Sequence, residues 1–347
     1  MQTNILAIDS INNQDYHRAT KRPINSGFTY WTRNELMPRI NLNILNCAVY
    51  LYASVQDAKQ GEKSGGSGFL VGMPYEGGWF VYAVTNSHVI REGRAPIVRL
   101  NKEKDIAYIG EYTQDMWIHH PDGDDLAIIP LDPEATRAKL RFVSTEMFIT
   151  KEIIQKEQIG AGDDVFMVGR FIGYDGKQQN EPTARFGNLS ISSSALIEHP
   201  RGYNQESFLI ETRSLAGYSG SPVFVHILPM SLRAPSGGWA KLRDRDWEDN
   251  NPYMYRGPWL LGVDWGHKHY METVREKNGE DEVAEGWKVP VNSGITCVVP
   301  AWKLLELLNI GELVQVRREE YERAQKQMLE EQELKEDGGV SLDSASN

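Results

Sequence analysis

Residues 79–90 have the sequence WFVYAVTNSHVI. The run from Trp79 to Val84 is apolar, aromatic and β-branched, which is typical of a buried strand, and the polar letters TNS that follow are typical of a strand's end. The pattern places His88, one of 8 histidines in 347 residues, just past that end. A histidine there is accessible enough to exchange protons and is held firmly enough to be aimed, so this stretch is a candidate for acid–base chemistry.

Short β-rich runs of the same kind, separated by Gly, Pro, Asn and Asp, continue through the middle of the chain. Because no helical periods separate them, they favour an all-β protein over a parallel α/β sheet. We predict two six-stranded antiparallel β-barrels with a C-terminal helical tail. The predicted divisions are an N-terminal extension at 1–40, the first barrel at 41–150, the second barrel at 151–308 and the charged helical tail at 309–347.

Composition limits the classes of partner. A formal net charge of −11 and a pI of about 5.3 oppose binding to nucleic acid and to anionic membranes. No secretory leader and no apolar run long enough for a membrane span is visible, so we expect a cytoplasmic protein. Cys47 and Cys297 are too few for a disulfide framework and too far apart for a zinc motif, and we predict two buried thiols.

Two long polar insertions, at 229–258 and 267–290, interrupt the strand pattern. After Pro300 the period becomes helical, and the final charged segment carries a thin stripe at Val314, Tyr321 and Met328. Two interpretations of that helix stay open: an arm that binds a partner, or a solvated helix docked on the body, which the short stripe favours. The tail and the insertions are the places where we expect a regulatory protein partner.

Three stretches carry the residues of a nucleophilic hydrolase. They contain His88, then Asp125 in DGDDLAII, then Ser219 in GYSGSPV. Hydrolysing an acyl bond with a serine requires an imidazole base, a carboxylate that orients it, and N–H donors for the oxyanion. The glycines around Ser219 allow a tight turn that aims backbone N–H groups into one space, and we expect those of Gly217 and Ser219 to form the oxyanion hole.

Together these motifs make the chain resemble trypsin-like, chymotrypsin-fold serine peptidases, with a texture similar to bacterial peptidases of the high-temperature-requirement type. The resemblance covers about residues 45–308 and rests on GSGFLVG, VTNSHVI, DDLAIIPL, GDDVFMVGRF, GYSGSPVF, LLGVDWG and SGITCVVP. It implies that His88 is the general base, Asp125 orients it and Ser219 is the nucleophile. It also implies two β-barrels with the site between them and a protein or peptide substrate.

The same resemblance implies the substrate-binding residues. Asp264, Trp265 and Gly266 would pair with the substrate backbone, and Gly294 would leave the specificity pocket open. Arg213, six residues before Ser219, falls at the base of that pocket. It either favours acidic side chains or pairs with a nearby carboxylate, in which case a small or apolar preference is equally open.

One residue departs from the digestive enzymes. Tyr218 stands where they have an aspartate that binds a newly cleaved N-terminus. That salt bridge is not available here, so the resemblance implies regulation by ordering of loops, with the two insertions as candidate switches.

Three rival interpretations were weighed. GYSGS is similar to an α/β-hydrolase elbow, but that fold needs alternating strands and helices. The histidine pairs His119-His120 and His267-His269 lack a carboxylate or cysteine at a recognised ligand spacing, so we expect no metal and no cofactor. The more serious alternative is a catalytically silent scaffold that binds a protein partner. Because all three residues of the triad are present, we predict a metal-independent serine endopeptidase.

Overall fold

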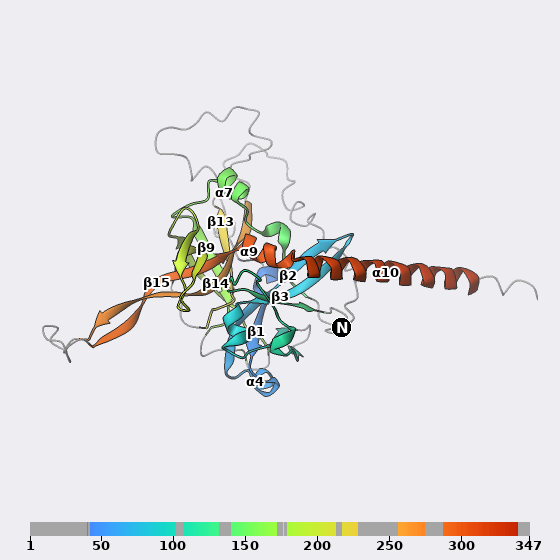
Figure 1. Cartoon of the computed structure of the whole chain (residues 1–347), viewed down its shortest axis with the longest axis horizontal. Coiled ribbons are helices and arrows are strands. Elements are labelled where there is room, and N and C mark those ends of the chain that lie inside the picture. The colour runs from blue at the N-terminus through green and yellow to red at the C-terminus, as the bar shows by residue number, and fades with distance from the viewer. Residues whose placement is uncertain are drawn as a thin grey trace, which may run out of the picture.

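The computed structural model of the chain describes residues 40, 42–101, 107–131, 140–171, 176, 179–212, 217–227, 256–274 and 287–338. Two β-sheets make up the body, and a long C-terminal helix projects from it (Figure 1). The prediction of a mostly β protein with a C-terminal helical tail is confirmed.

The first sheet has eight strands rather than the predicted six. Among the described residues its ladder runs in the order β5-β4-β1-β2-β3-β7-β6, and β8 pairs with β2 in parallel. The two additional strands, β6 and β8, are two residues long each, too short to leave an alternating pattern in the sequence. The strands are β1 (Ala48–Tyr52), β2 (Ser64–Tyr75), β3 (Gly78–Thr85), β4 (Ile97–Asn101), β5 (Ala107–Gly110), β6 (Ile118–His119), β7 (Ala127–Leu131) and β8 (Val143–Ser144).

The second sheet closes into a six-stranded antiparallel barrel. Its order is β10-β9-β13-β14-β15-β12, and pairing between β10 and β12 closes the ring, while β11 adds to the edge of β12. Closure leaves the six strands without a free edge. The strands are β9 (Asp164–Gly169), β10 (Thr183–Leu189), β11 (Ala195–Glu198), β12 (Asn204–Thr212), β13 (Pro222–Ile227), β14 (Arg256–Thr273) and β15 (Lys288–Pro300).

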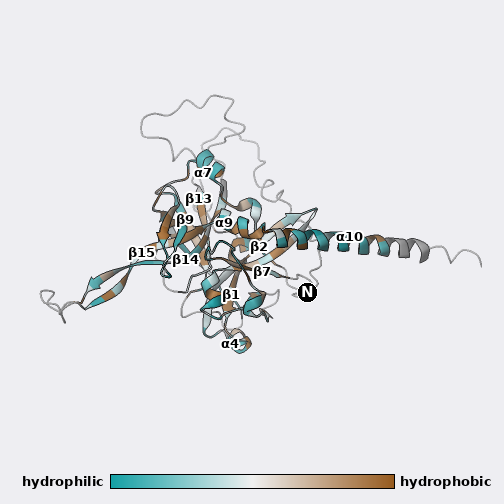
Figure 2. Cartoon of the chain, in the orientation of Figure 1, coloured by the Kyte–Doolittle hydropathy of each residue, from teal (hydrophilic) through white to brown (hydrophobic). Residues whose placement is uncertain are grey.

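One hydrophobic core cluster joins the two sheets. It contains Phe69 and Val84 from the first sheet, Val165 and Phe224 from the second, and Leu304 from α9 (Ala301–Leu308), all fully buried or nearly so. Figure 2 shows hydrophobic colour concentrated in the central strands. Each fully buried side chain of this size contributes about 1.5–3 kcal/mol, so the shared core holds the sheets in a fixed relation.

Among the described side chains of the C-terminal helix α10 (Gly311–Gly338), those buried against the body lie in its first three turns. Arg317 is 2% exposed and donates to the Tyr82 hydroxyl (3.0 Å) and to the Leu308 carbonyl (2.8 Å). The stripe predicted from the sequence does not face the body as a unit: Tyr321 packs on Tyr75, but Val314 and Met328 are exposed. The polar contacts of the helix with the body are made by the buried guanidinium of Arg317. A hydrophobic period in the sequence does not predict such contacts.

A two-stranded ribbon projects from the second barrel. β14 and β15 stay paired out to Thr273 and Lys288, so the ends of the expected insertion at 267–290 are strand (Figure 1). Its central part, and nearly all of the insertion at 229–258, lie outside the described residues, as does almost all of the predicted 1–40 extension.

Cys47 and Cys297 are buried and unpaired, as predicted. Burial raises the pKa of Cys297 to about 12, so that thiol stays protonated. The described part of the chain contains no helix with the length and apolar character that crossing a membrane requires.

Candidate active site

His88 lies in the short helix α5 (Ser87–Arg91). One residue, Asn86, separates this helix from the end of β3. The residue before the helix, Asn86, makes no cap bond with its side chain, and its amide N–H donates to the Asp125 carbonyl at 2.9 Å. Asp125 supplies the cap instead: its Oδ1 accepts the backbone N–H of His88 at 2.9 Å. The carboxylate is thereby fixed relative to the helix that carries the imidazole.

Asp125 also binds the ring of His88. The distance between Asp125 Oδ2 and His88 Nδ1 is 2.6 Å, with the carboxylate fully buried and the imidazole side chain 25% exposed. Burial raises the pKa of Asp125, but contacts with His199 and then hydrogen bonds from His88 outweigh it and hold that pKa below its usual range. Because an ionised carboxylate only accepts, Nδ1 carries the ring proton and Nε2 presents a lone pair.

Ser219 lies in a tight loop that packs against the first sheet. Its carbonyl accepts the N–H of Ser67 on β2 at 3.0 Å. Gly220 has a φ of +89°, and a Cβ there would lie 2.0 Å from the Ser67 carbonyl oxygen and 2.4 Å from the Thr85 hydroxyl, so only glycine fits. Thr85 is three residues before His88. The structure therefore brings the loop of the second barrel to the end of the strand that leads to the imidazole.

A glycine on β2 permits this approach. A Cβ on Gly66 would lie 2.8 Å from Val89, the neighbour of His88, and 3.4 Å from the carbonyl oxygen of Ser219. Gly66 belongs to β2, so the close approach is made by a strand. The missing side chain allows a small distance between α5, β2 and the serine loop.

The backbone amides of the serine loop fall into two groups. Gly220 donates to the Asp264 carbonyl and Ser221 to the Tyr218 carbonyl, each at 2.8 Å. Within the part of the chain that the structure covers, the N–H groups of Gly217 and Ser219 donate to no backbone carbonyl. Gly217 has a φ of +97° and its carbonyl accepts from the Ser67 hydroxyl at 3.2 Å, which fixes the peptide that turns into the loop.

Tyr218 is buried beside the candidate nucleophile. Its hydroxyl lies 2.9 Å from the Thr183 hydroxyl and accepts from Arg185 Nε at 2.9 Å. Both partners are on β10, so the loop is anchored to the second barrel through this side chain.

Asp264, Trp265 and Gly266 lie on β14, and the backbone of this strand pairs with the serine loop. The backbone of Asp264 binds the serine loop in both directions, since its N–H donates to the Ser221 carbonyl (2.9 Å) and its carbonyl accepts from Gly220. Its Oδ1 accepts the Gly266 N–H at 2.9 Å, while Oδ2 is buried without a hydrogen-bond partner among the described residues. Burial raises the pKa of Asp264 to about 8.

The remaining predicted substrate residues are placed only in part. A Cβ added at Gly266 or at Gly294 would meet no atom within 4 Å, so both glycines border open space. The β14–β15 register shifts between Asp264 and Gly266, which leaves Trp265 outside the ladder. Arg213 lies outside the described residues.

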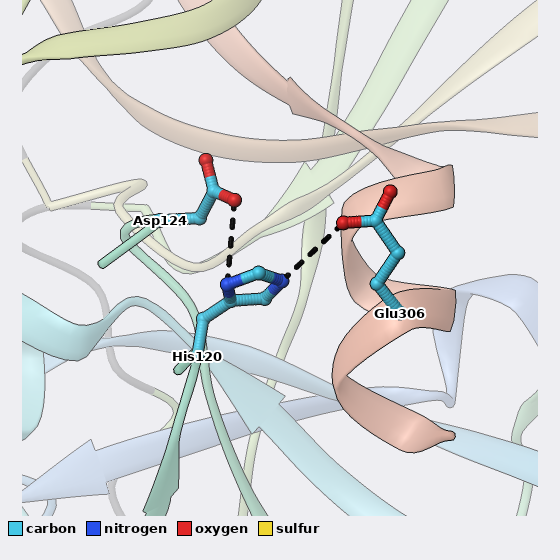
Figure 3. A group of neighbouring side chains, drawn as sticks. All are labelled: His120, Asp124 and Glu306. Carbon is cyan, nitrogen blue, oxygen red and sulfur yellow. Dashed lines mark ion pairs between the residues drawn. The ribbon is translucent and has the colours of Figure 1, made fainter. Parts of the chain in front are cut away.

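The adjacent histidines of the first sheet bind different groups. His119 Nδ1 lies 2.8 Å from the Ser87 hydroxyl, and burial, with help from Arg91, lowers its pKa to about 4, so this ring is neutral. His120 lies between Asp124 and Glu306 of α9 (Figure 3).

The His120 cluster is a bridge between two elements, and one ligand atom from each of its three residues lies within 4.8 Å of the others. Nδ1 is 3.3 Å from Asp124 and Nε2 is 3.8 Å from Glu306, so opposite edges of the ring face the two carboxylates. Lys303 supplies the cation, at 3.5 Å from Asp124 and 3.0 Å from Glu306. The bridge ties α9 to the turn that precedes Asp125.

Sequence reasoning missed two residues that reach this turn. Gln205 accepts the Asp125 N–H at 2.9 Å and donates to Asp124 at 2.6 Å, and His199 lies 3.6 Å from Asp125. Both come from the second barrel, 80 and 74 positions further along the chain. No local motif marks them, because their contact depends on how the two sheets dock.

Comparisons with known proteins give one family match. Residues 66–226, which include His88, Asp125 and Ser219, match the family Trypsin-like peptidase domain. No curated protein sequence matches the chain. Similar solved structures include the HtrA-type protease AlgW with a decapeptide, at 16% identity and a TM-score of 0.40, covering 72% of this chain and 52% of that one.

Two further structures are similar. The Rv3671c protease from M. tuberculosis in its active form has 15% identity and a TM-score of 0.40, with 77% of this chain and 81% of that chain covered. Deg5 has 17% identity and a TM-score of 0.36, covering 65% of this chain and 83% of that one. This chain thus spans about half of the AlgW chain. The resemblance expected from the motifs is confirmed by the match of residues 66–226 to the trypsin-like peptidase family.

Proposed function

We propose that the protein is a serine endopeptidase that works through His88, Asp125 and Ser219. The observation that carries the proposal is the His88–Asp125 pair, bonded at 2.6 Å and 2.9 Å, at the strand end against which the Ser219 loop packs. A trypsin-like peptidase domain is the family context in which such an arrangement hydrolyses peptide bonds.

The proposed reaction begins with proton transfer from Ser219 Oγ to His88 Nε2. Oγ forms a bond to the substrate carbonyl carbon, and the oxygen that becomes negative is bound by the N–H groups of Gly217 and Ser219. The peptide C–N bond then breaks as His88 returns the proton to the leaving amine. Water, deprotonated by His88, then attacks the acyl carbon, the bond from that carbon to Ser219 Oγ breaks, and His88 returns the proton to Oγ. Asp125 balances the imidazolium charge in both steps.

We also propose that a peptide or protein substrate binds as an added strand along Trp265 and Gly266. The backbone of Trp265 has no ladder partner in β15, and Gly266 borders open space. An extended peptide that pairs there would gain main-chain hydrogen bonds, which recognise it without reading its sequence.

Activation is proposed to depend on ordering of loops. The site of an N-terminal salt bridge is filled by Tyr218, which is already bonded to Thr183 and Arg185. We place the candidate switches at the two insertions, 229–258 and 267–290, which flank β14. The helical tail is the other candidate contact for a regulatory protein.

The test is labelling with a fluorophosphonate probe, followed by identification of the modified residue. We expect modification at Ser219, its complete loss in Ser219→Ala, and unfolding free energies of the two proteins within about 0.5 kcal/mol. Ser221→Ala is the matched control, because that serine is two positions away but fully buried, and it should label like wild type. A wild-type protein that folds and never labels would instead be a silent scaffold.

A further inference from the structure

A second imidazole lies at the carboxylate of Asp125. Nε2 of His199 is 3.6 Å from Asp125 Oδ2, the same oxygen that binds His88 Nδ1 at 2.6 Å. The distance is longer than a hydrogen bond and within the range of a strong electrostatic contact. His199 is 5% exposed, so little water screens this contact.

The orientation of the His199 ring follows from its own turn. Nδ1 accepts the backbone N–H of Arg201 at 3.3 Å, which requires a lone pair on Nδ1. A neutral ring then carries its proton on Nε2, the nitrogen that faces Asp125. The turn is closed by His199 N–H to the Tyr203 carbonyl (2.8 Å) and by Gly202 N–H to the His199 carbonyl (2.9 Å).

Two aromatic rings hold the imidazole in place. Tyr203 stacks on it with centroids 4.5 Å apart and planes 16° apart, and Trp265 lies against it at 4.6 Å and 31°. Trp265 is itself fixed by a hydrogen bond from its indole N–H to the Ser207 hydroxyl at 2.9 Å. The ring therefore cannot turn its N–H away from Asp125 without breaking this packing.

The same hairpin makes further contacts across the two sheets. Arg201 forms an ion pair with Glu92, which ends α5, the helix that carries His88. Gln205 binds both the N–H of Asp125 and the side chain of Asp124. The β11–β12 hairpin of the second barrel thus contacts the acid and the far end of the helix that bears the base.

We propose that His199 is a positioning residue: its N–H, delivered by the second barrel, fixes the Asp125 carboxylate and shares its negative charge with His88. The proposal rests on the proposed peptidase function for its kinetic consequences but not for its electrostatic ones. His199 touches no reacting atom in the proposed mechanism, and it acts through Asp125.

The charged and titratable groups around Asp125 come from four directions. They are His88 on α5, His119 on β6, His199 and Tyr203 on the hairpin, and Asp124 on its own turn. Without the His199 N–H, the negative charge of Asp125 attracts the His88 proton more strongly, and Asp125 itself becomes easier to protonate. Both changes move the acid limb of the activity profile to higher pH.

The experiment compares variants at position 199. His199→Phe keeps a ring between Tyr203 and Trp265 but has no N–H. His199→Gln reaches Asp125 with an amide N–H, and His199→Asn is equally polar but too short, which provides a donor-free variant should Phe not fold. Tyr203→Leu weakens the stacking, while Trp265 and the Arg201 N–H still hold the donor in place.

Two quantities are measured against pH: the rate of fluorophosphonate labelling, and the titration of His88 by imidazole nitrogen NMR, assigned with His88→Ala. We expect labelling in His199→Phe and His199→Asn to fall about tenfold, and both pH midpoints to rise by about half to one unit. His199→Gln should have the labelling rate and the pH midpoints of the wild type. Tyr203→Leu should lower stability and leave the midpoints near the wild-type values.

The outcomes separate the two proposals. A shifted NMR midpoint in a protein that never labels would support His199 as a positioning residue and overturn the peptidase function. Wild-type midpoints in both His199→Phe and His199→Asn would overturn the positioning proposal. So would a His199→Gln variant as impaired as His199→Phe, because that result assigns His199 to packing alone.

Discussion

Asp125 and Asp264 are both fully buried, and their environments drive their ionisation in opposite directions. Asp125 receives an N–H and a ring N–H from His88 and faces a third donor on His199. Asp264 receives one N–H, from Gly266, and its other oxygen has no hydrogen-bond partner in the described structure. Neither carboxylate is exposed, so the donors and the attraction of His88 account for the difference.

The contrast shows that two buried aspartates in one protein can have different roles, one as an anion and one as a neutral side chain. A charge is retained where the proposed reaction needs an anion to balance an imidazolium, and it is suppressed where the strand packs against the loop that bears the candidate nucleophile. The pKa of Asp264, about 8, leaves this side chain largely protonated at neutral pH. The backbone of Asp264 holds the serine loop through two hydrogen bonds, while its buried side chain is largely uncharged.

The largest expected effect comes from Asp125→Asn. An asparagine amide donates to Nδ1 instead of accepting from it, so the ring proton moves to Nε2 and the lone pair that takes the serine proton is lost. We expect labelling of Ser219 to slow by about ten-thousand-fold. The rate of fluorophosphonate labelling at neutral pH measures it.

Asp124→Asn is the matched control for that change. Asp124 is adjacent in the chain but faces Gln205, His120 and Lys303 rather than His88, so labelling should stay within about tenfold of wild type. Equal loss in both variants would mean that the turn as a whole, and not the carboxylate of Asp125, supports the reaction.

A smaller effect, on stability, is expected from Asp264→Asn. The folded-state pKa of Asp264 is raised to about 8 from an ordinary 3.8, so the folded state binds the proton more tightly than the unfolded state. Stability from this group is complete below pH 4 and is lost as pH rises toward 8. The asparagine cannot ionise, so the variant should lack this component of the pH dependence.

Urea unfolding at pH 5 and pH 8 measures the effect. We expect the loss of unfolding free energy between these two pH values to be smaller in the variant by at least about 1.4 kcal/mol, the value of one pKa unit. Parallel pH curves for the two proteins would show that Asp264 is ionised in the folded state and has a donor for Oδ2.

Much of the fold could be predicted, because strands of a sheet that is buried on one or both faces leave a pattern in the sequence. The run from Trp79 to Val84 lies within one residue of the observed ends of β3. The ribbon at β14–β15 was not expected, since its outer half carries exposed Tyr270, Met271 and Val289 among polar residues and has no buried face to produce alternation.

The candidate site divides in the same way. Each of the triad candidates was found because it sits in its own short motif, next to a strand. His199 and Gln205 were not, because they belong to an ordinary hairpin and gain meaning only when β11–β12 docks on the turn at Asp125. Contacts between sheets depend on the three-dimensional register, which one sequence does not specify.

The smallest expected effect tests whether a partly exposed charge behaves like the buried ones. Lys303 is 20% exposed; burial lowers its pKa, but the nearby carboxylates of Glu306 and Asp124 outweigh this and raise it. Lys303→Met should cost under about 1 kcal/mol, because solvent and salt screen the pairs. Its labelling rate should match wild type, since Gln205 still holds Asp124.

Lys326→Met, which removes the exposed pair with Glu330 on α10, is the control and should be neutral. Unfolding free energies at low and high salt measure both variants. A loss at Lys303 that persists in high salt would mean that this bridge has the buried character of Asp125, and that α9 is held to the turn before Asp125 by charge as well as by its apolar face.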